Sequence, residues 1–339
     1  MSLPPSLPRL TILDVGHGNS AVIQSGAEVF VVDSGTGGHL LQFLEDSRIS
    51  HINDLFISHS DSDHINGVTP LVNSTELSIG RLHCNGDGQQ DSRTWSDFLY
   101  MLEERSRSMD TRMRIDFRSG LSTSEAKLTS GDVSIDVLAP NPALLHLGVG
   151  NKTRTGKKIV SNSLSAVIRV RHLDRPTLLL PGDIDEVGLE DLSRLGTDLK
   201  ADILVYPHHG GRGRGSMTTF AMNLMTLVEP RIVVFSIGRG LHRTPQPEVV
   251  AAVRRARPGA WIACTQLSEH CAAEPPRNAA GHLSVVHARG KHTGTCCAGS
   301  LVIELGDSPR IMPEQGQHST FVTQLGPSPL CRRILPPAN

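Results

Sequence analysis

Short apolar runs separated by polar or glycine-containing turns recur along the chain, as they do in proteins that alternate strands and helices. Near the start, the runs at residues 10–15, 20–24 and 29–32 predict three strands. Apolar residues within 40–44 then predict a helix, and the run at 55–57 predicts a buried strand.

The same alternation continues to the end of the chain. Further strands are predicted at 133–138, 165–170, 177–180, 203–206 and 232–237, and a last core strand at 299–305. Helices are predicted at 95–104, at 185–195 and at 247–256, and the last of them has Pro247 in its first turn.

The domain organisation follows from length and from polar stretches. With 339 residues the chain can bury a large core. We expect one domain over 1–306, with insertions at about 86–130 and 268–295, and a C-terminal tail over 307–339. The tail is rich in Pro, Gln and Ser and is expected to pack on the domain or to bind a partner. The wider region 263–339 is the one through which a protein partner could bind.

The segment His59-Ser60-Asp61-Ser62-Asp63-His64 places four metal-ligating side chains within six residues, directly after the strand at 55–57. Neighbouring residues of a strand point to opposite faces, so the segment is predicted to be a strand-to-helix loop that could serve two metals. The alternative is a polar turn that matches by chance.

Two other predicted strands also end in ligand-type residues. Asp183 follows the strand at 177–180, and His208 and His209 follow the strand at 203–206. The carboxyl ends of strands are where sites form in open α/β sheets. A capping Asp or a buried His explains one such strand end, whereas three together favour a dinuclear metal site. Two divalent ions, either Zn or Mn, could share a water and lower its pKa to about 7, which gives a hydroxide nucleophile.

Eight segments, in this order, resemble the metallo-β-lactamase superfamily, and within it the soluble C-terminal hydrolase domain of competence (DNA-uptake channel) proteins. They are Leu13 to Ser20, Val32 to Gly35, His59 to Gly67, Asn162 to Leu164, Leu180 to Asp183, Pro207 to Gly210, Ser236 to Gly238 and Pro245 to Val249. The resemblance covers about residues 10–260. It implies an α/β (α+β) fold, the four-layer αββα sandwich, with the site at the sheet edges and DNA cleavage as the reaction.

The resemblance also implies roles for individual residues. His59 and Asp61 would hold one metal, Asp63, His64 and His208 the other, and Asp183 would bridge them. Asp33 would brace the ligand loop, although an Asp before Ser-Gly is equally typical of a turn. The residues expected to act in catalysis are Asp63, His209 as a proton donor or supporting group, and His242.

Two positions depart from the family pattern. Asn162 stands where the family usually has a His ligand, so the first metal either lacks a strong ligand or uses Asn162. Thr244 stands where the competence-like branch has a His, and His242 could substitute for it.

The net charge of −1, the pI near 7.0 and 4% aromatic residues give no general preference for nucleic acid, so a polyanion would need local basic loops. Arg212 and Arg214 follow the His208 strand end, and Lys157 and Lys158 precede Asn162. These four residues are predicted to bind a phosphodiester; the alternative is that they lie in ordinary solvated loops without a ligand. We expect a DNA nuclease; the alternatives are a small-molecule or cyclic-nucleotide metallohydrolase and a metal-depleted scaffold subunit.

The N-terminus has no apolar core of a secretory signal and no run is long enough to span a bilayer, so a cytoplasmic protein without a membrane partner is expected. The six Cys are then thiols or metal ligands rather than disulfides. Cys264, Cys271, Cys296, Cys297 and Cys331 lie late in the chain with several His. Two interpretations of these cysteines are kept: ligands of an additional structural Zn around 268–295, or plain buried thiols.

Overall fold

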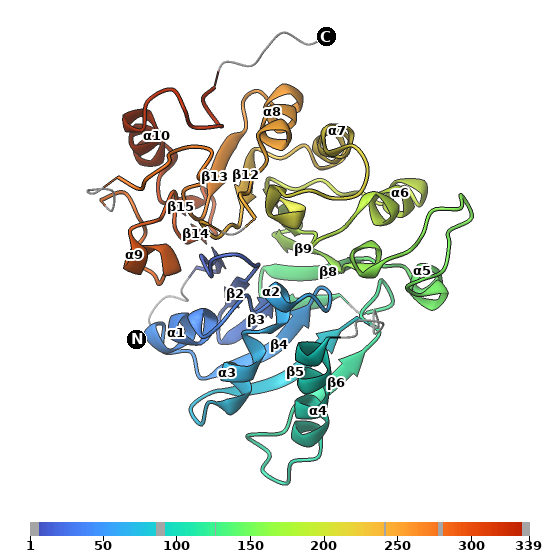
Figure 1. Ribbon diagram of the computed structural model, residues 1–339. Helices are drawn as coiled ribbons and strands as arrows, with labels where there is room; N and C mark the ends of the chain where they lie inside the picture. Colours follow the sequence, from blue (N-terminus) through green and yellow to red (C-terminus); the bar gives the residue numbers. More distant parts are fainter. Residues whose placement is uncertain (1–6, 86–91, 126, 241, 277–280, 334–339) are drawn as a thin grey trace.

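The computed structural model describes residues 7–85, 92–125, 127–240, 242–276 and 281–333. Within these residues the strands form two sheets that pack face to face, with helices on both outer sides (Figure 1). The arrangement is a sandwich of four layers, helix, sheet, sheet and helix, as predicted.

The first sheet has the order β15-β14-β1-β2-β3-β4-β5-β6. Its strands are β1 (Arg9–Ile12), β2 (Ala21–Ser25), β3 (Glu28–Val32), β4 (His51–Ile57), β5 (Ser78–Cys84), β6 (Asp116–Ser119), β14 (Leu301–Glu304) and β15 (Arg310–Met312). Strands β3 to β6 run parallel to one another, so β3 and β4 end at the same edge.

The second sheet has the order β13-β12-β11-β10-β9-β8-β7. Its strands are β7 (Leu128–Ser130), β8 (Val133–Ala139), β9 (Val167–His172), β10 (Arg175–Leu180), β11 (Ile203–Val205), β12 (Ile232–Phe235) and β13 (Trp261–Cys264). Strands β10 to β13 are parallel, so β10, β11 and β12 also end at one edge.

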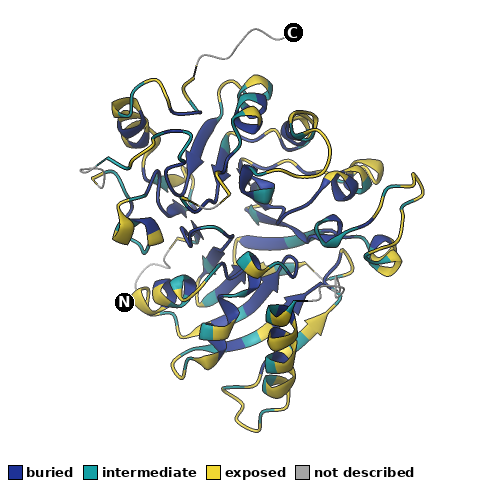
Figure 2. Ribbon diagram, viewed as in Figure 1, coloured by how far each residue is buried: buried dark blue, intermediate teal, exposed yellow. Residues whose placement is uncertain are grey.

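The helices cover the outer faces of the sheets and remain exposed on their far sides (Figure 2). Those that pack on the first sheet are α1 (His39–Asp46), α3 (Val68–Asn73) and α4 (Arg93–Ser106). Those that pack on the second are α6 (Glu186–Arg194), α7 (Met217–Val228), α8 (Pro247–Ala256) and α10 (Gln315–Gln324). The shorter helices are α2 (Ser62–Ile65), η1 (Ser161–Leu164), η2 (Pro207–Gly210), α5 (Pro142–Leu147) and α9 (Arg289–Thr293).

Strand β3 shows how the sequence produces the layers. Phe30 and Val32 belong to the apolar cluster between the two sheets, whereas Val29 and Val31 belong to the cluster under the helices. Successive side chains of a strand point to opposite faces, so a strand in a middle layer has to be apolar on both. The continuous apolar run at 29–32 therefore predicts a central strand.

The C-terminal segment differs from the prediction. The strand at 299–305 is not the last, because β15 follows it and pairs with β14 in antiparallel register. Helix α10 then packs on the second sheet through Phe321 and Val322. Of the two alternatives for this tail, the described part at 307–333 packs on the core, while 334–339 lies outside the described residues.

Other parts of the fold were not anticipated either. Strand β13 and helix α7 belong to the second sheet and its cover, and neither was predicted. The segment 86–130 is more than an insertion, since β6 and β7 each extend a sheet and Trp95 and Phe98 of α4 are buried in the core. Residues 86–91 and 126 lie outside the described part.

None of the helices in the described residues is long and apolar enough to cross a membrane.

Candidate metal centre

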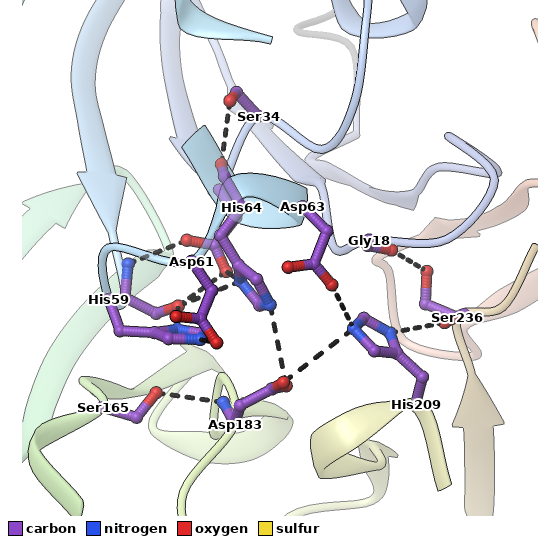
Figure 3. A network of polar contacts seen from close by, with 12 residues as sticks. Gly18, Ser34, His59, Asp61, Asp63, His64, Ser165, Asp183, His209 and Ser236 are labelled. Carbon is purple, nitrogen blue, oxygen red and sulfur yellow. Dashed lines mark hydrogen bonds and ion pairs between the residues drawn. The ribbon is translucent and has the colours of Figure 1, made fainter. Parts of the chain in front are cut away.

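The candidate ligands converge where the carboxyl ends of parallel strands from both sheets meet (Figure 3). After β4 the chain forms a short loop over 58–61 and then helix α2, which begins at Ser62 and carries Asp63 and His64. The predicted strand-to-helix loop is therefore confirmed. Facing it across the gap between the sheets are Asp183, after β10, and His209, within η2 after β11.

The deeper of two ligand groups consists of His59, His64 and Asp183, and all three residues are buried. One ligand atom from each lies within 4.8 Å of the others. The Nε2 atom of His64 lies 3.6 Å from Oδ1 of Asp183, and Nε2 of His59 lies 3.4 Å from Oδ2 of Asp61.

The second group consists of His17, Asp63 and His209, again with one ligand atom from each within 4.8 Å of the others. Oδ2 of Asp63 lies 3.0 Å from Nε2 of His209 and 3.6 Å from Nε2 of His17. Oδ2 of Asp183 lies 3.9 Å from Nε2 of His209, so Asp183 stands between the two groups.

Hydrogen bonds determine which nitrogen of each imidazole carries a proton. Nδ1 of His64 lies 2.7 Å from Oδ2 of Asp33, and a carboxylate can only accept. Nδ1 of His59 lies 3.0 Å from Oγ of Ser58, whose hydroxyl is positioned to donate to Asp33 Oδ2 at 2.9 Å. In both histidines Nδ1 is thus the donor, and Nε2 of each is buried without a hydrogen-bond partner in the described structure.

His209 is oriented in the same way by a different partner. Its Nδ1 lies 2.7 Å from the carbonyl oxygen of Ser236, so Nδ1 donates. In a neutral imidazole, Nε2 would then present a lone pair to the carboxylate of Asp63, which is also an acceptor. Three imidazoles therefore direct Nε2 lone pairs at carboxylate oxygens, an arrangement that requires a cation, either a proton or a metal ion.

The pKa values show how strongly the site favours positive charge. Burial disfavours charged His64, yet Asp33 and Asp183 raise its pKa well above the usual value. Burial likewise opposes charge on His209, but Asp183 and Asp63 raise its pKa. Burial also opposes ionisation of Asp183, whereas His209, His208 and His64 lower its pKa well below the usual value. A divalent ion fits these residues, because it would replace the protons and satisfy the same lone pairs.

Asp33 is the support of the ligand loop. Its Oδ1 accepts the backbone N–H of Ser58 at 2.7 Å, in addition to the bonds from Ser58 Oγ and His64. Its backbone is in the left-handed region, with φ of 58°, which is costly for a residue with a side chain. The structure thus places Asp33 where a brace is needed, and the bonds go beyond those of an ordinary turn.

Between the two candidate histidines after β11, His209 is the one that points at both carboxylates. His208 lies to the side, with Nδ1 3.5 Å from Oδ2 of Asp183 and 3.5 Å from Nδ2 of Asn162. Both residues have positive φ, 52° and 55°, so the backbone turns sharply after the strand. The geometry therefore favours His209 over His208 for the group that contains Asp63.

Three further predicted residues, His242, Arg212 and Arg214, lie outside the two ligand groups. The ring of His242 lies beside that of His17, with centroids 4.4 Å apart and the ring planes tilted by 40°, and His242 is exposed. Arg212 and Arg214 are exposed on the loop after η2, and no ion pair of either is found in the described residues. Arg214 also lines a hollow beside His208.

Lys157 and Lys158 differ in what they can offer a substrate. The ammonium of Lys157 contacts Glu186 at 3.1 Å and also Glu190, both on α6, so its charge is already compensated. Lys158 is exposed and takes part in an isolated backbone bridge with Lys152. The structure thus leaves Lys158, rather than Lys157, available for a phosphate.

The late cysteines do not form a compact metal site. Cys264, Cys271, Cys297 and Cys331 line one cavity together with His318. Among the described residues, however, the groups with three ligand atoms within 4.8 Å are the two around Asp183, and no cysteine belongs to them. Of these, Cys264, Cys271 and Cys297 are buried thiols, as in the second alternative, and Cys331 is half-buried. Burial raises the pKa of Cys264 and Cys297 well above the usual value.

The residues of this site lie partly in a segment that is similar to a known family. A model of the metallo-beta-lactamase superfamily matches residues 13–87, which include Asp33 and the whole segment from His59 to His64. The match supports a relationship of this chain to the metallo-beta-lactamase superfamily. The two-sheet sandwich is consistent with the metallo-beta-lactamase fold. No curated protein sequence matches the chain.

Solved structures are similar at low identity. The metallo-beta-lactamase fold protein YhfI from Bacillus subtilis has 11% identity and a TM-score of 0.47, with 76% of this chain and 96% of that chain covered. Igni18, a metallo hydrolase from Ignicoccus hospitalis, has 11% identity and a TM-score of 0.44, covering 77% and 97%. Human tRNase Z, short form, has 15% identity and a TM-score of 0.38, covering 66% and 91%.

Sequence reasoning did not find three residues that the site uses. Ser58 and Ser236 fix the imidazoles, and serines at strand ends carry no signal of that role. His17 lies in the segment Leu13 to Ser20 that carries the resemblance, but no role in the site was predicted for it from the sequence. Its flanking glycines, Gly16 and Gly18, were the available signal, because they allow close approach of the backbone.

Proposed function

We propose that this protein is a metal-dependent phosphodiesterase that cleaves DNA, with two divalent ions held on either side of Asp183. One observation supports it most: His59, His64 and His209 all keep Nδ1 as a donor and direct Nε2 toward carboxylates. That is the arrangement of metal-ligating histidines, in which the partner of one nitrogen orients the other.

In this proposal the deeper ion is held by His59, His64 and Asp183, with Asp61 beside His59. The other ion would be held by Asp63 and His209, and Asp183 would contribute to both from its place between the groups. When bound, two such ions supply Lewis acidity for a phosphoryl oxygen and activate water at about pH 7. The carboxylates and imidazoles of both groups suit Zn as well as Mn.

The protein's own residues would orient these groups and bind the substrate. Asp33 holds the ring of His64, and Ser236 holds that of His209. His208 lies beside Asp183 and close to Asn162, and in this proposal it would contact the substrate. In this proposal His242, which is exposed beside His17, would donate a proton to the departing oxygen.

DNA as the substrate rests on two features. Arg212 and Arg214 form an unpaired basic loop next to His208, and guanidinium groups bind phosphates bidentately. The sequence motifs, from Leu13-Asp14-Val15-Gly16 to Pro245-Gln246-Pro247, are most like those of the competence-protein hydrolase domain. Both features favour a polynucleotide over a small ester, and a cytoplasmic enzyme remains part of this proposal.

The test is cleavage of labelled single-stranded, double-stranded and circular DNA by the metal-free protein reconstituted with Mn or Zn. We expect metal-dependent cleavage by the wild type and at least about a thousandfold less by Asp63→Ala, since the change removes a ligand. Cleavage of the circular substrate would assign an endonuclease. No cleavage of any DNA by protein that has taken up metal would contradict the DNA assignment.

A further inference from the structure

The loop Gly16-His17-Gly18, between β1 and β2, reaches the candidate metal centre from a third direction. Its His17 comes from neither α2 nor η2, yet Nε2 lies 3.6 Å from Oδ2 of Asp63. The His17 side chain is largely covered, with 12% of its surface exposed, so it points into the site rather than into solvent.

The backbone around His17 is packed so closely that side chains are excluded. A Cβ atom on Gly18 would lie 2.3 Å from the carbonyl oxygen of Asp63, and one on Gly238 would lie 2.4 Å from the backbone nitrogen of His17. Gly18 has φ of 138°, which residues with side chains rarely adopt. The hydroxyl of Ser236 donates to the carbonyl oxygen of Gly18 at 2.7 Å. These contacts hold the loop directly against the start of α2.

The distance between His17 and Asp63 fits a shared ion better than a direct hydrogen bond. At 3.6 Å, the two atoms are too far apart for a hydrogen bond. Two ligand atoms that each lie about 2.1 Å from one ion, at a tetrahedral angle, are about 3.4 Å apart. Nε2 of His209, 3.0 Å from the same oxygen, completes a set of three.

We propose that His17 is a direct ligand of the ion on the Asp63 side, so that His17, Asp63 and His209 form its protein ligand set. The proposal rests on the metal centre proposed above and adds a ligand to it. It gives this ion three ligands of its own, while His59, His64 and Asp183 lie around the other and Asp183, 3.9 Å from His209, still stands between the two groups. The competing role for His17 is packing alone, because its ring lies between those of His209 and His242, at 4.3 and 4.4 Å.

Calorimetric titration of the metal-free full chain with Mn and with Zn separates these roles. We expect His17→Ala to weaken one of the two binding events at least about 10–100-fold, the loss that even indirect support of a ligand causes, and to leave the other. The Co-substituted protein should lose or shift the visible absorption of one ion. His146→Ala is the matched control, because His146 is an exposed histidine on α5, and it should change neither readout.

A His17→Ala protein with both affinities and the Co spectrum of the wild type would overturn the proposal. Circular dichroism and a thermal melt establish whether the variant is folded. If His17→Ala does not fold, His17→Gln, which keeps more of the side-chain volume, takes its place in the same titration. Wild type that takes up no ion would overturn both this ligand and the proposed function. Wild type that binds two ions but cleaves no DNA would overturn the DNA assignment and leave the test of His17 intact.

Discussion

At the scale of single residues, the hydrogen bond made by Nδ1 of each histidine decides what its Nε2 can do in the site. A histidine near a carboxylate is common, but His64 and His209 have Nδ1 fixed by Asp33 and by a backbone carbonyl. The orienting partners therefore decide whether Nε2 is a ligand or a donor. Asp33 is the most exacting of them, since it serves both the ring of His64 and the Ser58 that contacts His59.

Replacing Asp33 tests this support. In Asp33→Asn the amide would offer donors where His64 Nδ1–H also donates, so the ring loses its fixed orientation. We expect metal affinity to fall about 10–100-fold, measured by titration of the metal-free protein. Asp54→Asn is the matched control: Asp54 is also buried and also binds an imidazole, His83, at 2.8 Å, but it is not among the candidate ligands. Equal metal affinity in the two variants would contradict the role of Asp33.

The residue scale also shows what sequence could and could not predict. His59, Asp61, Asp63, His64 and Asp183 were identified because each follows a recognisable apolar strand. His17 was not identified, because a single histidine in a glycine turn acquires its meaning only from the tertiary contact with α2. The choice between His208 and His209 needed the φ angles of the turn, which no sequence pattern specifies.

At the scale of elements, the loop 211–215 after η2 is the candidate contact for a polyanion. Its two arginines are exposed and Arg214 lines the hollow beside His208, whereas Lys157 is paired with α6. We expect the double change Arg212→Ala with Arg214→Ala to weaken DNA binding and to lower the slope of log affinity against log salt by about 2, one for each lost phosphate contact. Lys157→Ala should leave the slope unchanged. An unchanged slope in the double variant would show that the loop does not bind phosphate.

Helix α10 gives a second prediction at this scale. Its His318 is buried, accepts the indole N–H of Trp261 on β13 at 3.1 Å and has its pKa lowered to about 4 by burial and then by His282. The unfolded chain takes up a proton below about pH 6.5, and the folded His318 does so only near pH 4. Stability that is present above pH 6.5 is therefore lost as the pH falls toward 4.

Urea unfolding at pH 7 and pH 5 measures this effect. Between the two, the wild type should lose about 2 kcal/mol more unfolding free energy than His318→Gln, which cannot titrate but can still accept from Trp261. The same pH dependence in both proteins would mean that His318 does not titrate in this range. Helix α10 itself was missed in the sequence because few of its residues are apolar, and its contacts with the core come mainly from His318, Phe321 and Val322.

At the scale of the whole molecule, the sandwich brings ligands from both sheets to one edge. Strands β3 and β4 of the first sheet and β10, β11 and β12 of the second end there, and Asp183 faces the loop after β4 across the gap. The fold class could be predicted, because central strands are apolar on both faces and helices on one. The extension by β15 and α10 could not be predicted, because short edge elements of mixed composition have the same sequence pattern as an irregular tail.

The central claim is that two ions are held around Asp183. It is tested most directly by counting metal ions per chain by mass spectrometry, after loading with Mn or Zn and removal of free metal. We predict about two ions for the wild type and fewer than one for Asp183→Ala, because that carboxylate reaches both ligand groups. A wild type without bound ions, or an Asp183→Ala protein that retains both, would contradict the account.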